Sequence, residues 1–336
     1  TGTANDLPGT NHGALSDNTT AGIARWRAYE DSALQQLRAV DSRSLGTGAD
    51  RVLHGVLLDQ VERDVGVRVC RLELWGVASY VNGWQASLTD LARVQPAGTD
   101  ELRALALQRA RAIPRYIDNE VVLLQQGLRA GYSSPKVIVR EVISQLDSLL
   151  AATPAQSPFS APAQKDTTPA FQSAYHAIVR DEINPAVRRY RTFLQEKYLP
   201  AAREEPGVAA NPDGRARYDA VVRQFSTVPM AADDVYATGQ RQIQRLDAEM
   251  RPLALRLTGT EDVTRAMRMI VSDPRFMFRT EAEIIATAQA AQDRASAAMP
   301  RAFGLHTTVP VQIQPYPEFR AKAGAPGQYQ PPPDDD

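Results

Sequence analysis

The stretch TDELRALALQRARAIPRYIDNEVVLLQQGLRAG, residues 99–131, decides the fold class. Apolar residues recur in it at spacings of three and four, the period of one face of an α-helix. These residues are Leu102, Ala106, Ala110, Ile113, Ile117, Val121, Leu124 and Leu128. The pattern predicts one long helix over about residues 99–130, kinked at Pro114 and ended by Gly131.

The next two helices are predicted from their start signals. SSPKVIVREVISQLDSLL, residues 133–150, places Ser134 at the cap and Pro135 in the first helical position. Residues 168–199 predict a helix opened by Pro169 and bent at Pro185.

Helical signals continue to about residue 300. TEAEIIATAQAAQDRASAAM, residues 280–299, begins with a capping box, in which Glu283 follows Thr280 by three residues. Further helices are expected near residues 20–40, 49–64, 213–225, 231–256 and 261–271. The predicted fold class is therefore mainly α.

A short β element is expected near the end of the chain, over residues 307–332. VPVQI, residues 309–313, alternates apolar and polar side chains as a half-buried strand does, and Pro310 favours an edge position.

The predicted organisation has five parts. A Pro/Ser/Ala/Thr-rich connection divides two helical segments, and the ends differ in composition from both. The parts are a flexible N-terminus (1–18), an N-terminal helical lobe (19–151), the connection (152–169), a second helical segment (170–304) and the strand region with the C-terminal edge (305–336).

Charge and cysteine content exclude several classes. The net charge of −1 gives no electrostatic footprint for nucleic acid, and no apolar run is long enough to span a membrane. Cys70 is the only cysteine, so the chain can form no internal disulfide and no cysteine zinc knuckle. Its apolar neighbours predict a buried side chain rather than a reactive thiol.

No catalytic motif is present. The four histidines, His12, His54, His176 and His306, do not form H-E-x-x-H, and His54 and His176 lie among core-like residues that favour structural roles. The adjacent carboxylates Asp181 and Glu182 would point about 100° apart on a helix, which favours a solvated face over a shared substrate. The tryptophans are interpreted as anchors, and residues 77–88 as a packed loop with a possible role in lining a pocket.

Five segments in order resemble the bacterial DUF-885 family of zinc metallopeptidase-like proteins. They are residues 118–150, the SPF at 157–159, residues 190–227, DDVYATGQRQIQRLDAEM at 233–250 and VQIQPYPEFRAKAGAPGQYQPPPDDD at 311–336. The resemblance implies a helical fold related to Taq-type carboxypeptidases and neurolysin, with two lobes facing a channel. Members carry H-E-A-x-P-G-H-H in their C-terminal half, which would supply zinc ligands and the base. No position of this sequence matches that motif, so none inherits those roles.

Two interpretations follow. In the first, the chain is the N-terminal part of a zinc-dependent metallopeptidase-like hydrolase and forms a wall of its peptide-binding channel. Zinc and the general base then come from a C-terminal half that is a separate chain or a segment absent from this sequence. In the alternative, the chain is a non-catalytic helical binding or scaffold module.

The first interpretation carries further expectations. A large interface with the C-terminal half should form, because soluble monomers avoid broad exposed apolar faces. Peptide contacts are expected at Tyr316, Arg320, Tyr329 and Gln330, with packing on the partner as the alternative role. Because members of the family are often exported, the resemblance also implies a periplasmic or otherwise exported protein, and the cytoplasm stays open.

Overall fold

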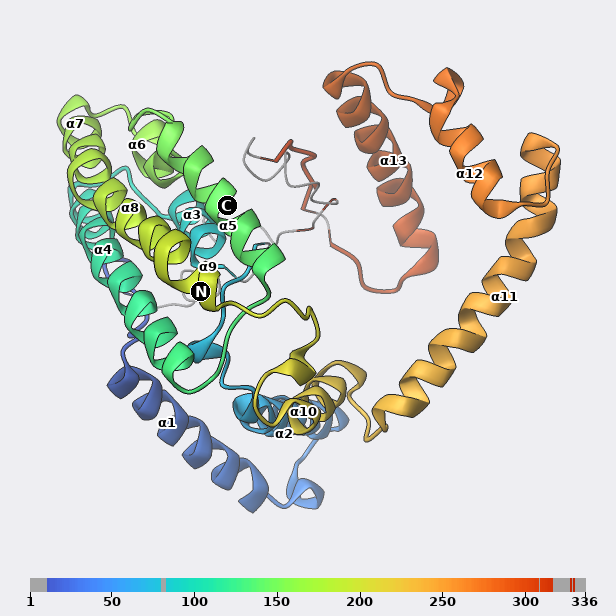
Figure 1. The fold of residues 1–336 in the computed structure, drawn as a ribbon, viewed down its shortest axis with the longest axis horizontal. Coiled ribbons are helices and arrows are strands. Elements are labelled where there is room, and N and C mark those ends of the chain that lie inside the picture. The colour runs from blue at the N-terminus through green and yellow to red at the C-terminus, as the bar shows by residue number, and fades with distance from the viewer. Residues whose placement is uncertain (1–10, 80–82, 308, 317–326, 328, 330–336) are drawn as a thin grey trace. The chain divides into compact units, whose positions relative to one another are not determined.

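The computed structural model describes residues 11–79, 83–307, 309–316, 327 and 329 (Figure 1). Within these ranges the regular elements are helices, and no strand occurs, so the mainly α fold class is confirmed. The described residues form two units. The first comprises those up to Met230 together with residues 327 and 329, and the second comprises those from Ala231 to Tyr316. Nearly all buried apolar side chains of the described residues belong to the first unit.

Two packed helices open the first unit. α1 (Thr20–Ala39) and α2 (Gly48–Gly66) are capped by Thr19 and Thr47, whose hydroxyls accept hydrogen bonds from backbone N–H groups of the first turn. Between them, Arg38 pairs with Glu62 at 2.9 Å. Threonine caps thus define both helix starts from local sequence.

Residues 77–88 hold a helix start where the sequence favoured a packed loop. α3 (Trp84–Val94) begins at Trp84, and seven of its residues are buried. Trp84, Leu88 and Leu91 recur at spacings of three and four, a period that only becomes clear when the window is extended to Val94.

α4 (Asp100–Arg129) is the predicted long helix and packs against the segments that follow it. It runs through Pro114 without interruption, and Gly131 follows it with φ of 81°, a conformation that glycine adopts without strain. The buried apolar face includes Ala106, Ile117 and Leu124. Full burial of each large aliphatic side chain stabilises the fold by about 2 kcal/mol.

α5 (Lys136–Ala151) starts differently from the prediction. Pro135, rather than Ser134, is the residue preceding the first turn. The Ser134 hydroxyl instead donates to the backbone oxygens of Trp75 (2.6 Å) and Val77 (3.0 Å). The Ser134 hydroxyl, which the sequence predicted as the helix cap, thus bonds backbone oxygens of a distant segment instead.

The helix predicted over 168–199 contains two π turns. α7 (Pro169–Ile178) leads into a π segment, Val179–Ile183, then α8 (Asn184–Phe193), a second π segment, Leu194–Tyr198, and the short α9 (Leu199–Ala201). Pro185 and Pro200 each lie two residues after a π segment. The carbonyl four residues before each proline therefore falls inside the π turn, whose wider spacing accommodates the proline ring.

The Pro/Ser-rich connection is part of the first unit and not a divider. It contains a 3₁₀ turn, Pro158–Ser160, and α6 (Ala161–Lys165), and Phe159 is only 1% exposed. Asp166 fastens it to α4 by accepting a hydrogen bond from Arg103 at 2.8 Å. The break between the units lies instead after Met230, which differs from the division expected at 152–169.

α10 (Gly214–Ser226) completes the first unit through one buried arginine. Arg217 is 1% exposed, and its guanidinium donates to the backbone oxygens of Pro212 and Cys70 and to the Tyr132 hydroxyl. This side chain joins α10 to η3 (Val67–Cys70) and to the loop before α5.

The second unit contains α11 (Ala232–Thr258), α12 (Val263–Ser272) and α13 (Glu281–Ala302). The first half of the capping box predicted for α13 is present, since the Thr280 hydroxyl accepts from the Glu283 N–H at 3.2 Å. The Glu283 carboxylate accepts from the N–H of Arg279, one residue before the cap, instead of from that of Thr280. Buried apolar residues in the described part of this unit are Ala232, Ala254 and Ala266.

The strand expected at 309–313 is absent from the described residues, where 309–316 carry no regular structure. The Ile313 N–H donates to the Gln289 side chain of α13, at 3.4 Å, rather than to a neighbouring strand. Alternation alone cannot form a strand without a partner for its backbone groups. The rest of the predicted β element, 317–332, lies outside the described residues except for 327 and 329, which also carry none.

Candidate functional site

The residues predicted to contact peptide fall in different parts of the chain. Tyr316 is half-buried in the second unit, and Tyr329 is 70% exposed and groups with the first. Arg320 and Gln330 lie outside the described residues. The peptide contacts therefore stay a prediction.

The donor set for zinc is not present in the described residues. No three His, Cys, Asp or Glu side chains there lie close enough together to hold a metal ion. His54 bonds the Leu37 carbonyl at 2.9 Å, although the flanking residues that suggested a core position, such as Val52 and Val56, are exposed. The buried Nε2 of His176 has no hydrogen-bond partner among the described residues. Cys70 is fully buried, and burial raises the pKa of its thiol. The described side chains thus do not fit a zinc centre.

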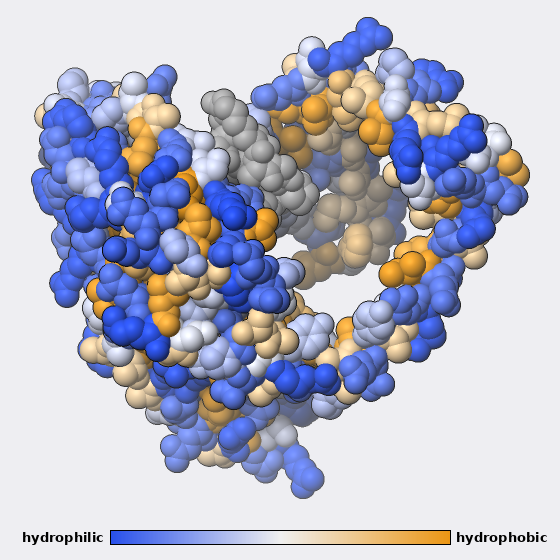
Figure 2. All heavy atoms as spheres, in the orientation of Figure 1, coloured by the Kyte–Doolittle hydropathy of each residue, from blue (hydrophilic) through white to orange (hydrophobic). Residues whose placement is uncertain are grey.

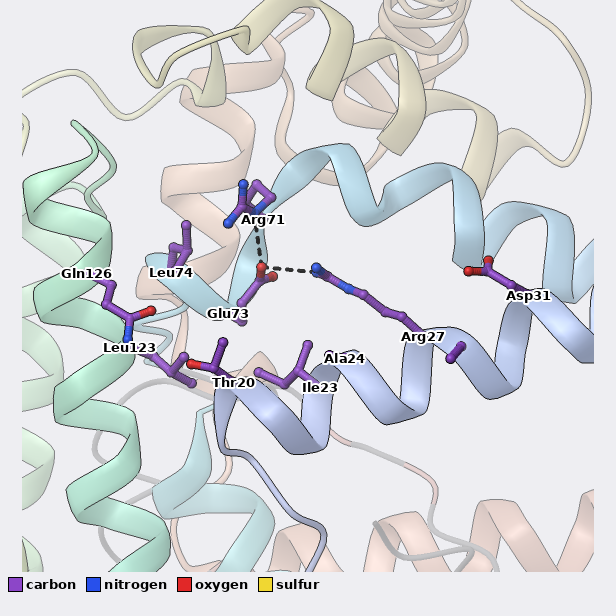
Figure 3. Close-up of a pocket in the computed structure, with 11 residues that line it drawn as sticks. Thr20, Ile23, Ala24, Arg27, Asp31, Arg71, Glu73, Leu74, Leu123 and Gln126 are labelled. Carbon is purple, nitrogen blue, oxygen red and sulfur yellow. Dashed lines mark hydrogen bonds and ion pairs between the residues drawn. The ribbon is translucent and has the colours of Figure 1, made fainter.

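A pocket of about 350 Å³ lies in the first unit between α1, η4 (Leu72–Leu74) and α4 (Figure 3). We call it the α1–α4 pocket. Its lining residues are Thr20, Ile23, Ala24, Arg27, Ala28, Asp31, Arg71, Glu73, Leu74, Leu123 and Gln126.

Two of the elements that line the α1–α4 pocket, α4 and η4, pack closely through their backbones. Gly127 of α4 lies against η4 so tightly that an added Cβ would sit 1.7 Å from the Leu74 carbonyl oxygen. Leu74 of η4 and Leu123 of α4 are both buried and both line the pocket as apolar residues. A glycine at this position therefore permits the pocket.

The polar rim of the α1–α4 pocket has one carboxylate between two guanidinium groups (Figure 3). Oε1 of Glu73 accepts from Arg27 Nη2 at 3.0 Å and from Arg71 Nε at 3.1 Å. The Glu73 side chain is 17% exposed, so these charges interact in a partly desolvated setting.

Arg71 is held in an unusual backbone conformation. With φ of 48° and ψ of 41° it is left-handed, and it links η3 to η4. Non-glycine residues adopt this region rarely and at a cost, so the surrounding packing enforces it. The turn directs the Arg71 side chain to the rim, where it meets Glu73.

Arg27, Arg71 and Glu73 were not predicted as site residues. No motif marks them, because their meeting depends on a positive φ and on contacts between segments about 45 residues apart. The single glycine inside the apolar pattern of 99–131, Gly127, was the available signal, since a glycine within a helix often marks a close approach.

A half-buried carboxyl, that of Glu120, lies on α4 beside the N-terminal segment. Glu120 Oε1 accepts from the Asn18 amide at 2.8 Å, and the same amide donates to the Tyr116 carbonyl. Burial raises the pKa of Glu120, and the bond from Asn18 opposes that rise. Asn18 is the acceptor position of a glycosylation triplet in the sequence, and its amide is engaged in these contacts.

The second unit presents an unusual amount of apolar surface (Figure 2). Along α11 five of the exposed apolar residues follow one face at alternating spacings of three and four, whereas Leu255 lies on another side of the helix. We call this face the α11 seam: Ile243, Leu246, Met250, Leu253 and Leu257, between 37% and 63% exposed. Such a seam is the pattern by which one helix packs against another.

The fold and these sites define a mainly helical protein with a packed first unit and a second unit whose described residues bury few side chains. The sequence matches the family described as bacterial protein of unknown function (DUF885) over residues 2–336, and the chain belongs to this family. No curated protein matches it.

A solved structure has a similar fold. It is a "putative lipoprotein" from Colwellia psychrerythraea, 17% identical, with a TM-score of 0.78. The match covers 95% of this chain and 58% of that one, so the chain spans little more than half the length of that protein. None of the helices in the described ranges combines the length and apolar character needed to cross a bilayer.

Proposed function

We propose that this chain is the N-terminal helical part of a zinc-dependent metallopeptidase-like hydrolase. It forms a wall of the peptide-binding channel, and a C-terminal half supplies zinc and the general base. The activity comes from the resemblance of the five segments quoted above, and the division of labour follows from the donor set, which does not fit zinc within the described residues.

The main support for this proposal is the exposed apolar face of the α11 seam. α11 has 27 residues, an apolar face along its length and only two buried residues. Soluble monomers rarely expose such a face to water, because its burial against another element is favourable. The matched Colwellia protein has 58% of its length covered, which leaves a large remainder that could supply a covering element. A helix of the C-terminal half is the proposed occupant.

The alternative is a non-catalytic helical binding module. The same seam supports it, because a helix-in-groove partner would cover an equivalent face. The two proposals differ in whether the partner brings a metal and a peptide-cleaving activity.

Export is proposed as the location. The support is the description of the Colwellia protein as a lipoprotein, together with the family resemblance. Tyr316, Arg320, Tyr329 and Gln330 stay proposed peptide contacts, and unchanged peptide turnover after Tyr329→Ala or Arg320→Ala in the assembled protein would rule them out.

The experiment is co-expression of the chain with a C-terminal family segment bearing H-E-x-x-H. We expect a one-to-one complex with one zinc per complex and an interface above roughly 1,000 Å². Mass by light scattering, metal analysis and peptide turnover measure these three properties.

Two variants test the seam directly. Ile243→Glu with Leu253→Glu should abolish the complex, because two charges would be buried in an apolar contact. Gln244→Glu, at an exposed polar position of α11, is the matched control and should leave the complex intact. A chain that stays a monodisperse monomer beside the segment would contradict the proposal and favour the binding module.

A further inference from the structure

The α1–α4 pocket has unused hydrogen-bonding capacity of both signs. Arg27 and Arg71 both bond Oε1 of Glu73, and among the contacts of the described residues Oε2 has no partner. The two Nη groups of Arg71 likewise make no bond to these residues, although a guanidinium offers five donors. An acceptor oxygen and a pair of donors therefore lie next to each other at the rim.

Adjacent charges of opposite sign match a zwitterion. A carboxylate fits a guanidinium in the paired geometry of two parallel N–H···O bonds, and an ammonium fits the free oxygen of a carboxylate. In an α-amino acid these two groups are attached to the same carbon, so they are adjacent as the Arg71 donors and the Glu73 oxygen are.

The apolar wall of the α1–α4 pocket determines the side chain. Ile23, Ala24, Leu74 and Leu123 are the apolar lining residues, and Figure 3 shows Ile23 extending from α1 toward the space below Glu73. A volume of about 350 Å³ is at the small end of the roughly 300–1,000 Å³ that small-molecule sites occupy. A single amino acid or a dipeptide end fits that size.

We propose that the α1–α4 pocket binds a small zwitterion with an apolar side chain, such as a free aliphatic amino acid. Arg71, assisted by Arg27, binds the carboxylate, Glu73 binds the ammonium group, and Leu74 and Leu123 contact the side chain. The site lies within the first unit and does not depend on the proposed hydrolase activity or on the C-terminal half.

The left-handed backbone of Arg71 supports a functional role for this side chain. A positive φ costs a non-glycine residue stability, and glycine or asparagine would occupy the position more readily. A binding role explains why an arginine stands there.

Calorimetric titration of the purified chain tests the site with four probes. L-leucine has both charges and the side chain. Glycine lacks the side chain, L-leucinamide lacks the carboxylate, and 4-methylpentanoate lacks the ammonium group. L-leucine should bind most tightly, and each of the other three should bind about tenfold more weakly or worse, since each lost charged hydrogen bond or buried aliphatic group is worth about 1.5 kcal/mol or more.

Substitutions at Arg71 and Glu73 test the carboxylate contact and the ammonium contact separately. Arg71→Asn keeps the left-handed turn and should weaken L-leucine and 4-methylpentanoate alike, by about tenfold. Glu73→Gln should weaken L-leucine but not 4-methylpentanoate, which has no ammonium group to lose. Arg25→Gln, an exposed arginine of α1 outside the pocket, is the control and should change neither.

The outcomes are decisive. No heat of binding with L-leucine at millimolar concentration overturns the proposal, and so does L-leucinamide binding as tightly as L-leucine. Equal loss in Arg71→Asn and Arg25→Gln would show binding elsewhere on the chain. Thermal unfolding of each variant, measured without probe, shows whether the fold is intact, and Arg71→Asn should melt no lower than the natural chain.

Discussion

Arg217 shows how a single buried charge can hold three segments together. Its guanidinium carbon lies 4.5 Å from the centre of the Tyr132 ring, and its nitrogens donate to Tyr132, Pro212 and Cys70. A lysine carries its three donors on one nitrogen and lacks the planar spread by which three separate guanidinium nitrogens each bond a different acceptor. The planar, five-donor shape of arginine is therefore what the site requires.

Arg217→Lys should destabilise the protein by about 3 kcal/mol, because at least one buried carbonyl and the Tyr132 hydroxyl lose their donor. Urea unfolding measures the change. Arg215→Lys, an arginine of the same helix whose side chain is 65% exposed, should stay within about 0.5 kcal/mol. Equal effects in the two variants would show that the contacts of Arg217 contribute little.

Glu120 gives the fold a pH dependence of defined sign. Burial raises the pKa of its carboxyl, so the folded state binds the proton more tightly than the unfolded state does. Its contribution to stability is complete below the unfolded pKa of about 4.3 and is lost as the pH rises through the higher folded value.

Glu120→Gln should therefore unfold at higher urea than the natural chain at pH 8, with a difference that shrinks toward pH 4. The amide oxygen of glutamine can still accept the bond from Asn18. Urea midpoints across this pH range measure the effect, and Glu101→Gln, at an exposed position of α4, is the control. A variant that is less stable than the natural chain at pH 8 would show that the ionised carboxylate is favoured where it lies.

At the scale of elements, α4 and η4 pack so closely that a side chain at Gly127 would overlap the backbone of η4. The Leu74 carbonyl lies where a side chain at Gly127 would begin, whereas nothing lies within 4 Å of the Cβ position of Gly55 in α2. Both glycines are inside helices, so they differ in surroundings rather than in backbone conformation.

Gly127→Ala and Gly55→Ala should consequently change stability in opposite directions. The first forces α4 away from η4 and should cost about 2 kcal/mol, as overpacking does. The second should stabilise the protein by about 0.5–1 kcal/mol, because alanine is the better helix former. Urea unfolding compares them, and a neutral Gly127→Ala would show that the two elements separate easily.

The two π turns are the other feature at this scale that local sequence patterns did not predict. The sequence predicts a bend at Pro185, and the structure places a π segment before it and another before Pro200. A missing N–H can be accommodated by a kink or by a wider turn, and the packing of α8 on α4 and α5 decides between them.

At the scale of the whole molecule, the two units differ in how their stability arises. The first buries the aliphatic and aromatic core, while the described second unit buries three alanines. Helices that bury so little side-chain surface depend on local propensity and on partners.

A chain shortened to Thr1–Met230 should therefore still unfold cooperatively, within about 1 kcal/mol of the full chain, since the core lies within it. Near-UV circular dichroism and urea unfolding measure this. Loss of the near-UV signal would show that the second unit contributes to the core, and dye binding by the full chain but not the shortened one would locate the exposed apolar surface in the second unit.

The sequence by itself determined the mainly helical class and the bounds of its longest helices, because apolar periodicity, threonine caps and glycine stops act within one turn of the chain. The apolar neighbours of Cys70 also predicted its burial correctly. Only the tertiary structure decided that the units divide after Met230, that Ser134 bonds a distant backbone, and that Arg27, Arg71 and Glu73 meet at one pocket. These features depend on contacts between residues far apart in the chain, which no local pattern records.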